Sequence, residues 1–504
     1  MATPSVIREL ELTPVEETLR RLLLDVAESI DQSESALSSD LQAGLPEQPA
    51  KDKVVLRFTG GWVRDKLLGV GSHDIDVAIN TMTGLQFGLR MKEYLEQPGN
   101  PEKYGLEGVA KNDAQSNKAS ASSKSKIVGG LHKIEANPEK SKHLETVTTR
   151  ILGLDIDLVN LRKETYTEES RNPQMEFGTP EEDALRRDAT VNAMFYNLGT
   201  SQIEDFTGKG HADMQAKIIR TPLEPHQTFK DDPLRVLRLI RFASRLNYII
   251  EPSAEQSMKD QDIKDALKIK ISRERVGVEL EKMLRGPDPH MALRLIDRLG
   301  LYTTIFADPS QSLDKAYRPD IENWRQLVDT VKSVQSDQRP LRGKFPFEKS
   351  QCSGFLLMRH SGILLRDVED EYMAWLLVCM VPYRDAPQAQ PSEPGRKMPP
   401  PEASNIAREG IKAMNKVCDV VTLSIRNRKE IAGLVSKLGE QRRRPHQAMK
   451  GEDPAARDTL GMAVRRWGPT WRAQAVFALL ADIADEPQST AGESLPASRF
   501  HQPI

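Results

Sequence analysis

The chain has 504 residues, 29% of them charged, and a formal net charge of −2. This length predicts about two to four domains with a substantial buried core, and the balanced charge gives no sign of a nucleic-acid partner, so any basic surface has to be local. Three cysteines without a CxxC pair argue against a zinc site or a disulfide framework. The sequence has no run of about eighteen apolar residues, so no membrane span is predicted.

The N-terminal region, residues 1–52, is expected to hold one helix followed by a linker. Thr13-Pro14-Val15-Glu16 resembles a capping box with proline in the first turn, and leucines recur on one side of the segment that follows. The acidic residues of this helix argue against a mitochondrial presequence, and the N-terminus lacks the apolar core of a secretory signal. Residues 34–52, rich in serine, glutamine, aspartate and proline, are predicted to be the linker.

The next segment carries two aspartates one residue apart. Residues 74–79 are predicted to form a strand, on which Asp74 and Asp76 project from the same face. Two parallel carboxylates suit Mg²⁺, which takes few carboxylates together with phosphate oxygens. A pair of solvated aspartates on an edge strand is the alternative.

A glycine turn lies just upstream of this strand. Gly60-Gly61-Trp62-Val63-Arg64-Asp65 is predicted to turn into a short helix, where glycine lets phosphate approach the backbone and free N–H groups favour an anion. Arg64 can reach the same anion with a charge-assisted hydrogen bond. The spacing fits neither a P-loop nor a dinucleotide fingerprint. Turn and carboxylates together indicate nucleotidyl transfer.

A polar stretch and a second strand pattern follow. Residues 97–145 are interpreted as a surface insertion in the head, and strand patterns return at 146–149 and 155–161. Asp157 in the latter is a candidate third carboxylate from a neighbouring strand, and a simple strand-edge charge is the equal alternative. Residues 163–180 are predicted to be a mobile loop.

Residues 185–194, Leu-Arg-Arg-Asp-Ala-Thr-Val-Asn-Ala-Met, open the helical part of the chain. In the functional interpretation, Arg187 binds a triphosphate or ribose and Asp188 binds a ribose hydroxyl. Asn192, about one helical turn beyond Asp188, could support the same sugar. The alternative is a charge cluster at the start of a helix.

The segment 231–242 repeats arginine every three residues, at Arg235, Arg238 and Arg241. On a helix this spacing drifts by about 60° per step, so the three side chains fan across about a third of the circumference, and a solvated basic stripe is the ordinary explanation. Asp232 and Arg235 also offer a fixed acceptor and donor set. Such a set can read the Watson–Crick edge of cytosine or adenine.

Strand patterns come first in the chain, and helical patterns dominate from about residue 182 onward. This segregation favours the α+β class, an α/β catalytic head followed by a long helical body, over a doubly wound sheet. Residues 484–504 are expected to be a flexible C-terminus.

These segments resemble the tRNA nucleotidyltransferases that add CCA, in the bacterial and eukaryotic class of the polymerase-β-like superfamily. The resemblance runs from about residue 54 to 285 and rests on five motifs in order, each weak alone: residues 60–76, 186–192, 205–222, 231–241 and 272–276. Residues 132–140 look like the eukaryotic, fungal branch. The resemblance implies a small mixed-sheet head over 53–200, a helical neck over 201–285, and a helical body and tail over 286–483.

The resemblance also implies roles for the motif residues. Asp74 and Asp76 would be catalytic and bind Mg²⁺. The triphosphate would be held by Gly60, Gly61 and Arg64, and the sugar by Arg187, Asp188 and Asn192. A protein template for CTP or ATP would be formed by Asp232 and Arg235, with Arg238 and Arg241 as further nucleotide-binding arginines and residues 272–276 bracing their helix. Asp231 departs from the family, where many relatives carry glutamate, which weakens the case for an orienting role there.

The activity implied is template-independent addition of CCA to tRNA 3′ ends, by in-line attack of the RNA 3′-hydroxyl on the α-phosphate of CTP, twice, and then of ATP. A partial enzyme that adds only CC or only A, and a poly(A) polymerase of the same superfamily, share these residues and stay open. An RNA-binding protein with a degenerate site is disfavoured, because the aspartate and template sets are intact.

The expected partners are the tRNA acceptor arm, CTP and ATP, with no membrane, for a monomer or weak dimer in the cytoplasm, nucleus and mitochondrion. Candidate tRNA contacts are the basic patches at residues 426–429, 442–444, 465–467 and 471–472. Solvated helix faces with tryptophans in the core are the alternative for each patch.

Overall fold

The computed structural model describes residues 10–41, 52–72, 74–106, 129–133, 147–167, 170–309, 311, 317–336, 364–391, 393, 397–443 and 453–485. Most of the predicted insertion and nearly all of the predicted flexible C-terminus lie outside these residues. The chain divides into two compact units, Met1–Asp232 with Ile249–Ala254, and Pro233–Tyr248 with Glu255–Ile504. The finer division into neck, body and tail stays a prediction.

A mixed seven-stranded sheet, in the order β3-β4-β5-β2-β1-β8-β9, forms the centre of the first unit. Strands β2 and β5 are parallel, and the other neighbours are antiparallel. All described strands lie before residue 251, and the described elements after that residue are helices, so the predicted α+β class is confirmed. The strands are β1 (Leu56–Thr59), β2 (Asp74–Ile79), β3 (Gly129–Lys133), β4 (Val147–Ile151), β5 (Leu154–Asn160), β8 (Phe195–Asn197) and β9 (Gln202–Glu204).

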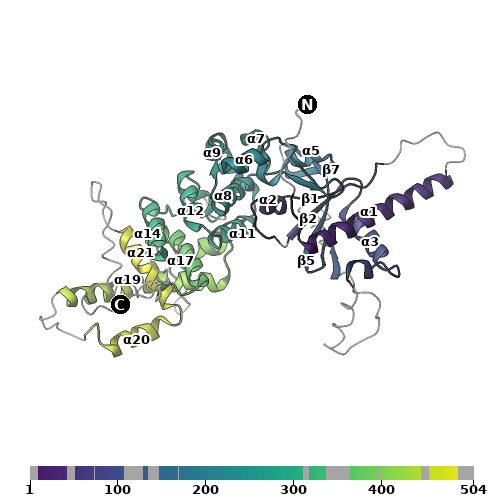
Figure 1. Ribbon diagram of the computed structural model, residues 1–504. Coiled ribbons are helices and arrows are strands. Elements are labelled where there is room, and N and C mark those ends of the chain that lie inside the picture. The colour runs from purple at the N-terminus through teal and green to yellow at the C-terminus, as the bar shows by residue number, and fades with distance from the viewer. Residues whose placement is uncertain are drawn as a thin grey trace, which may run out of the picture. The chain divides into compact units, whose positions relative to one another are not determined.

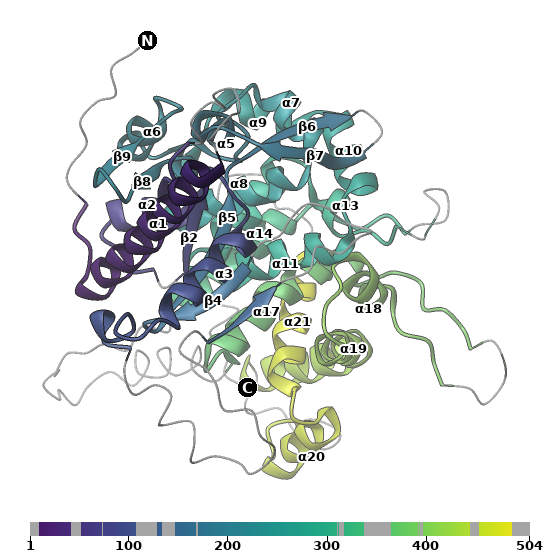
Figure 2. The same ribbon diagram turned by 90° about the vertical axis from the view of Figure 1, so that its right-hand side faces the viewer.

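Helix α1 (Pro14–Leu41) and helix α3 (Gly84–Leu95) lie side by side against this sheet (Figures 1 and 2). The predicted capping box is present, because Thr13 N–H donates to Glu16 Oε2 at 2.7 Å and Glu16 N–H donates to Thr13 Oγ1 at 3.3 Å. Leu19, Leu22, Leu23 and Val26, on the apolar side of α1, are fully buried. The helix continues to Leu41, so it takes in the first eight residues of the segment predicted as a linker.

Short helices and a second pair of strands complete the first unit. They are α2 (Gly61–Leu67), η1 (Glu102–Tyr104), α5 (Pro180–Leu185), η3 (Thr190–Asn192), α6 (Gly210–Ala216), α7 (Pro225–Asp231), β10 (Ile218–Ile219) and β11 (Ile249–Ile250).

The segment predicted as a mobile loop, residues 163–180, is instead an antiparallel hairpin of β6 (Arg162–Thr167) and β7 (Ser170–Phe177). Its base is fixed by the Gly178 N–H, which donates to the Leu161 carbonyl at 3.1 Å, and by Glu164. The prediction was wrong because the segment is predominantly polar, which favours a loop, whereas its backbone pairs as two strands.

The second unit is all-helical among its described residues. Its helices are α8 (Leu234–Leu246), α10 (Gln261–Lys270), α11 (Arg273–Leu284), α12 (Pro289–Arg298), α13 (Tyr302–Ile305), α14 (Trp324–Ser336), α17 (Val368–Met380), η4 (Val381–Tyr383), α18 (Glu402–Asn405), η5 (Ile406–Gly410), α19 (Asn415–Arg443), α20 (Arg457–Trp467) and α21 (Trp471–Ala484). Helix α9 (Pro252–Lys259) crosses the boundary between the units.

Aromatic residues form much of the core of the second unit. The ring of Tyr302 lies 4.7 Å from that of Trp324, centroid to centroid, and its hydroxyl donates to the Cys379 carbonyl at 2.6 Å. Trp324 Nε1 donates to the Val378 carbonyl at 3.0 Å. These contacts join α13, α14 and α17. None of the described helices is long and apolar enough to cross a bilayer.

Candidate active site

The two aspartates of the Asp-x-Asp pattern lie on β2, near the middle of the head sheet. Ile75 and Val77 alternate with them and are buried, so Asp74 and Asp76 project from the opposite face, as the alternation predicts. In the parallel ladder with β5, Asp76 is the register partner of Asp157. Asp157 therefore lies beside Asp76 on the same face of the sheet.

The environment of these carboxylates is strongly acidic. Burial is the main cause that raises the pKa of Asp76; Arg187 opposes it, and the charges of Asp157, Asp74 and Asp183 raise it further. A set of aspartate oxygens on one rigid face is the donor set that hard divalent cations take. In the part of the chain that the structure describes, three of these carboxylates are not gathered within 4.8 Å of one another. A shared cation would therefore need small side-chain movements.

The glycine turn touches this site directly. Gly60 has φ 73° and ψ −136°, a conformation that L side chains rarely adopt, and α2 begins at the next residue. A Cβ atom on Gly60 would lie 3.2 Å from Asp76 Oδ2 and 3.2 Å from Arg187 Nη1. The positive φ thus favours glycine, and a Cβ atom there would also be in tight contact with a carboxylate and a guanidinium.

Arg64, predicted to hold the triphosphate, is only 2% exposed. Its Nε and Nη2 donate to Asp65 Oδ1 at 2.8 and 2.7 Å, and its Nη1 donates to Asn192 Oδ1. Asn192 Nδ2 in turn donates to Asp188 Oδ1 at 3.3 Å. Three of the predicted site residues are therefore brought together as a buried chain of hydrogen bonds that links α2 to η3.

Arg187 is held by a carboxylate that the sequence did not reveal. Its Nε and Nη2 donate to Asp183 Oδ2 at 3.1 and 2.9 Å, its Nη1 donates to the Asn192 carbonyl at 3.1 Å, and its guanidinium lies 5.1 Å from the Phe195 ring centroid. The other oxygen, Asp183 Oδ1, accepts from Arg186 Nε at 2.9 Å.

Asp183 is 1% exposed. Burial alone would raise its pKa, but Arg187 and Arg186 together hold the pKa below its usual value. The available signal was its position four residues before Arg187 and three before Arg186 in a short helical segment, where such pairs face each other. That signal does not distinguish a buried carboxylate from an exposed one.

Helix α8 carries Arg235, predicted as part of the template, and the further predicted nucleotide-binding arginines Arg238 and Arg241. Arg235 is buried, Arg241 Nε donates to Glu279 Oε2 at 2.6 Å, and Arg238 Nη1 lies 3.9 Å from Glu279 Oε1. Glu279, on α11, is itself buried and was missed by the sequence reasoning. Asp232 directly follows α7 and belongs to the first unit, whereas Arg235 belongs to the second.

The motif at residues 272–276 starts α11. Arg273 is buried there, where its Nε donates to the Gly410 carbonyl at 2.6 Å and its Nη1 to the Thr304 carbonyl at 3.2 Å. These contacts fix α11, and Glu279 on the same helix contacts the arginines of α8.

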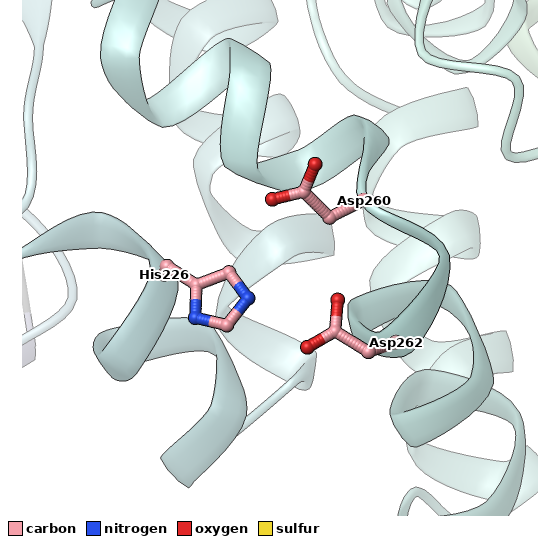
Figure 3. Close-up of side chains that lie close together, drawn as sticks. All are labelled: His226, Asp260 and Asp262. Carbon is pink, nitrogen blue, oxygen red and sulfur yellow. The ribbon is translucent and has the colours of Figure 1, made fainter.

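Figure 3 shows Asp260 and Asp262 at the start of α10, and His226 on α7. They belong to different units, so no metal site is assigned to them.

Two of the candidate tRNA patches contain arginines that form ion pairs. Arg428 Nη2 lies 2.8 Å from Asp385 Oδ1, and Arg466 Nη2 lies 2.6 Å from Glu430 Oε1. Trp467 is buried in a cluster with Ile431. These contacts fit the alternative of ordinary helix faces, and a role in tRNA binding stays a prediction.

Known proteins match the chain along most of its length. The profile of the poly A polymerase head domain matches residues 56–220, and that of a probable RNA and SrmB-binding site of polymerase A matches residues 247–313. Nucleotidyltransferase lcsQ of Purpureocillium lilacinum is 43% identical, over 96% of this chain and 73% of its own. The mitochondrial CCA tRNA nucleotidyltransferase of Saccharomyces cerevisiae is 50% identical over 59% of this chain and 48% of its own, so the chain spans about half of that enzyme.

Two further comparisons agree. The tRNA nucleotidyltransferase cca1 of Schizosaccharomyces pombe is 38% identical over 76% of this chain and 64% of its own. Among solved structures, the Thermotoga maritima CCA-adding enzyme complexed with tRNA has a TM-score of 0.52 at 18% identity, covering 95% of this chain and 85% of its own, which shows a shared fold. The chain belongs to the tRNA nucleotidyltransferases with a poly(A) polymerase head domain, in their fungal branch.

Proposed function

We propose that this protein adds CCA to the 3′ end of tRNA from CTP and ATP, without a nucleic-acid template, by metal-dependent nucleotidyl transfer. The observation that carries the proposal is the register of β2 and β5, which puts Asp74, Asp76 and Asp157 on one face beside the Gly60 turn and Arg187. The fungal relatives named CCA tRNA nucleotidyltransferases support the choice of reaction.

The carboxylates fit a divalent cation, for which we propose Mg²⁺. Asp74, Asp76 and Asp157 would hold it, and it would supply Lewis-acid stabilisation of the charge on the phosphate groups. Arg187, fixed by Asp183, is positioned beside this face to bind the triphosphate or ribose.

The chain's own contribution is positioning. The RNA 3′-hydroxyl oxygen forms the new bond to the α-phosphorus, and the bond from that phosphorus to the pyrophosphate oxygen breaks. Phosphate would bind at the backbone of the Gly60-Gly61 turn, next to Arg187. The hydrogen bonds from Arg64 to Asn192 and from Asn192 to Asp188 would hold the side chains that bind the sugar. No dedicated general base is assigned.

Incorporation of single labelled nucleotides tests the proposal. Purified protein should add two CMP residues to tRNA that lacks CCA, and one AMP to tRNA that ends in CC. Addition of CMP alone or of AMP alone would replace the proposal with a partial enzyme. Long AMP tracts on many RNAs would replace it with a poly(A) polymerase.

Asp232→Ala is expected to reduce the discrimination of CTP and ATP against GTP and UTP by about tenfold to a hundredfold, because one bidentate base contact accounts for about 1–3 kcal/mol. The KM for CTP should change less than the discrimination does. Competition between labelled nucleotides measures both.

Asp231→Ala is the matched control, since that side chain accepts from Gln227 Nε2 at 2.6 Å on the exposed side of α7. It should keep the selectivity of the unmodified protein. Unchanged selectivity in Asp232→Ala would reject the template role.

We further propose that the protein works in mitochondria, because two of the fungal relatives are named as mitochondrial enzymes. Presence in the cytoplasm and nucleus, and a monomeric or weakly dimeric state, stay predictions. Microscopy of the tagged protein and sedimentation would test them.

A further inference from the structure

One row of side chains crosses the face of the head sheet that carries the aspartates. The register partners, strand by strand, are Phe195, Thr59, Asp76, Asp157 and Thr148. Register partners on neighbouring strands point to the same face of a sheet. The two carboxylates at the centre of the row are therefore flanked by a threonine on each side, on β1 and on β4.

The two threonines differ in their contacts. Thr148 Oγ1 donates to Asp157 Oδ1 at 2.6 Å. Thr59 is 1% exposed, and within the described residues its Oγ1 has no hydrogen-bond partner. Buried hydroxyls in native proteins almost always have a partner. An orphan hydroxyl beside Asp76 therefore points to a partner gained in another state of the site.

The backbone places Thr59 where such a bond can form. Thr59 is the register partner of Asp76 and directly precedes Gly60, whose Cβ position lies 3.2 Å from Asp76 Oδ2. On the other side of Thr59, Phe195 lies under the Arg187 guanidinium. Along this row Thr59 thus has the Asp76 carboxylate on one side and, on the other, Phe195, whose ring contacts the Arg187 guanidinium.

We propose that Thr59 is a positioning residue, whose hydroxyl donates a hydrogen bond to the Asp76 carboxylate when the nucleoside triphosphate and its divalent cation are bound. The contact would reproduce on β1 what Thr148 does for Asp157 on β4. Carboxylates that ligate metals are regularly oriented by such outer hydrogen bonds. The inference rests on the proposed function of the site.

Thr59→Val tests it, because valine keeps the shape and removes the hydroxyl. The kcat for CMP addition should fall by about tenfold or more, and the Mg²⁺ concentration for half-maximal rate should rise, while the KM for tRNA stays unchanged. The melting temperature of the nucleotide-free protein should stay the same or rise, since an unpaired buried hydroxyl is lost. Thr59→Ser should restore the rate.

Thr81→Val is the matched control, because Thr81 Oγ1 is the same kind of buried atom without a partner in the described chain, beyond the end of β2. Its melting temperature should also stay the same or rise, while its kcat and its Mg²⁺ dependence should match those of the unmodified protein. A normal kcat and Mg²⁺ dependence in Thr59→Val would overturn the inference alone, as would equal kinetic losses in both variants. An unmodified protein that adds no nucleotide would overturn the proposed function, and this inference with it.

Discussion

Asp76→Asn is expected to lower the rate of nucleotide addition by at least about a thousandfold, or about 4 kcal/mol, while making the protein more resistant to heat. The rate falls because one carboxylate of the proposed cation site is lost. The stability rises because burial raises the pKa of Asp76, so that its ionised form disfavours the folded state at neutral pH and the neutral amide does not. Asp74→Ala should lose activity equally without the thermal gain, since Asp74 is exposed.

Single-turnover incorporation and melting curves measure the two effects, and filter binding should show tRNA affinity near that of the unmodified protein. Asp155→Ala is the matched control. Asp155 is the register partner of Asp74 on the same face, but it is exposed and lies 3.6 Å from Arg150 Nε. It should retain activity. Near-normal activity in Asp74→Ala would show that the metal assignment is wrong.

The sequence predicted the strands of the site but not how they pair. Alternation of apolar and acidic residues identified β2 and β5, and the glycines identified the turn before α2. That β5 pairs with β2 in parallel, with Asp157 opposite Asp76, could not be predicted, because about eighty residues separate the two strands. From the sequence, Asp157 could equally be a third carboxylate of the site or a simple strand-edge charge. The pairing places it beside Asp76.

The buried carboxylates were missed for a different reason. Asp183 and Glu279 read as ordinary surface charges in sequence, because acidic residues are rarely buried unless a partner from elsewhere in the fold compensates them. Their arginine partners were singled out, as nucleotide ligands.

The hairpin error has the same origin. The predominantly polar segment 163–180 was predicted to be a loop, while residues 162–177 form a hairpin. Glu164 near its base accepts from Arg186 Nη1 at 2.9 Å, and Arg186 binds Asp183. The hairpin is thus connected through Asp183 to Arg187, which a local reading of the sequence could not show.

Asp183→Ala is expected to destabilise the protein by about 3–5 kcal/mol, the usual consequence of removing one partner from a buried ion pair. Arg186 and Arg187 would lose their shared acceptor, and the KM for CTP and ATP should rise because Arg187 is no longer fixed beside Asp76. Urea unfolding measures the stability, and steady-state incorporation at saturating tRNA measures the KM.

The pH dependence of stability provides a second test of the same carboxylate. The pKa of Asp183 in the folded state lies below its value in the unfolded chain, so its stabilising contribution is complete above about pH 4 and is lost as the pH falls through the lowered pKa. The stability difference between the unmodified protein and Asp183→Ala should therefore shrink in acid. A constant difference would show that packing, and not charge, accounts for it.

Glu182→Ala is the matched control for Asp183→Ala. Glu182 is the adjacent acidic residue, it caps the start of α5 with Thr179, and its Oε1 lies 3.1 Å from Lys163 Nζ on the exposed side. Its loss should be far less destabilising and should leave the KM for both nucleotides unchanged, because it does not touch Arg187. Equal effects in the two variants would mean that α5 as a whole, and not the buried carboxylate, positions Arg187.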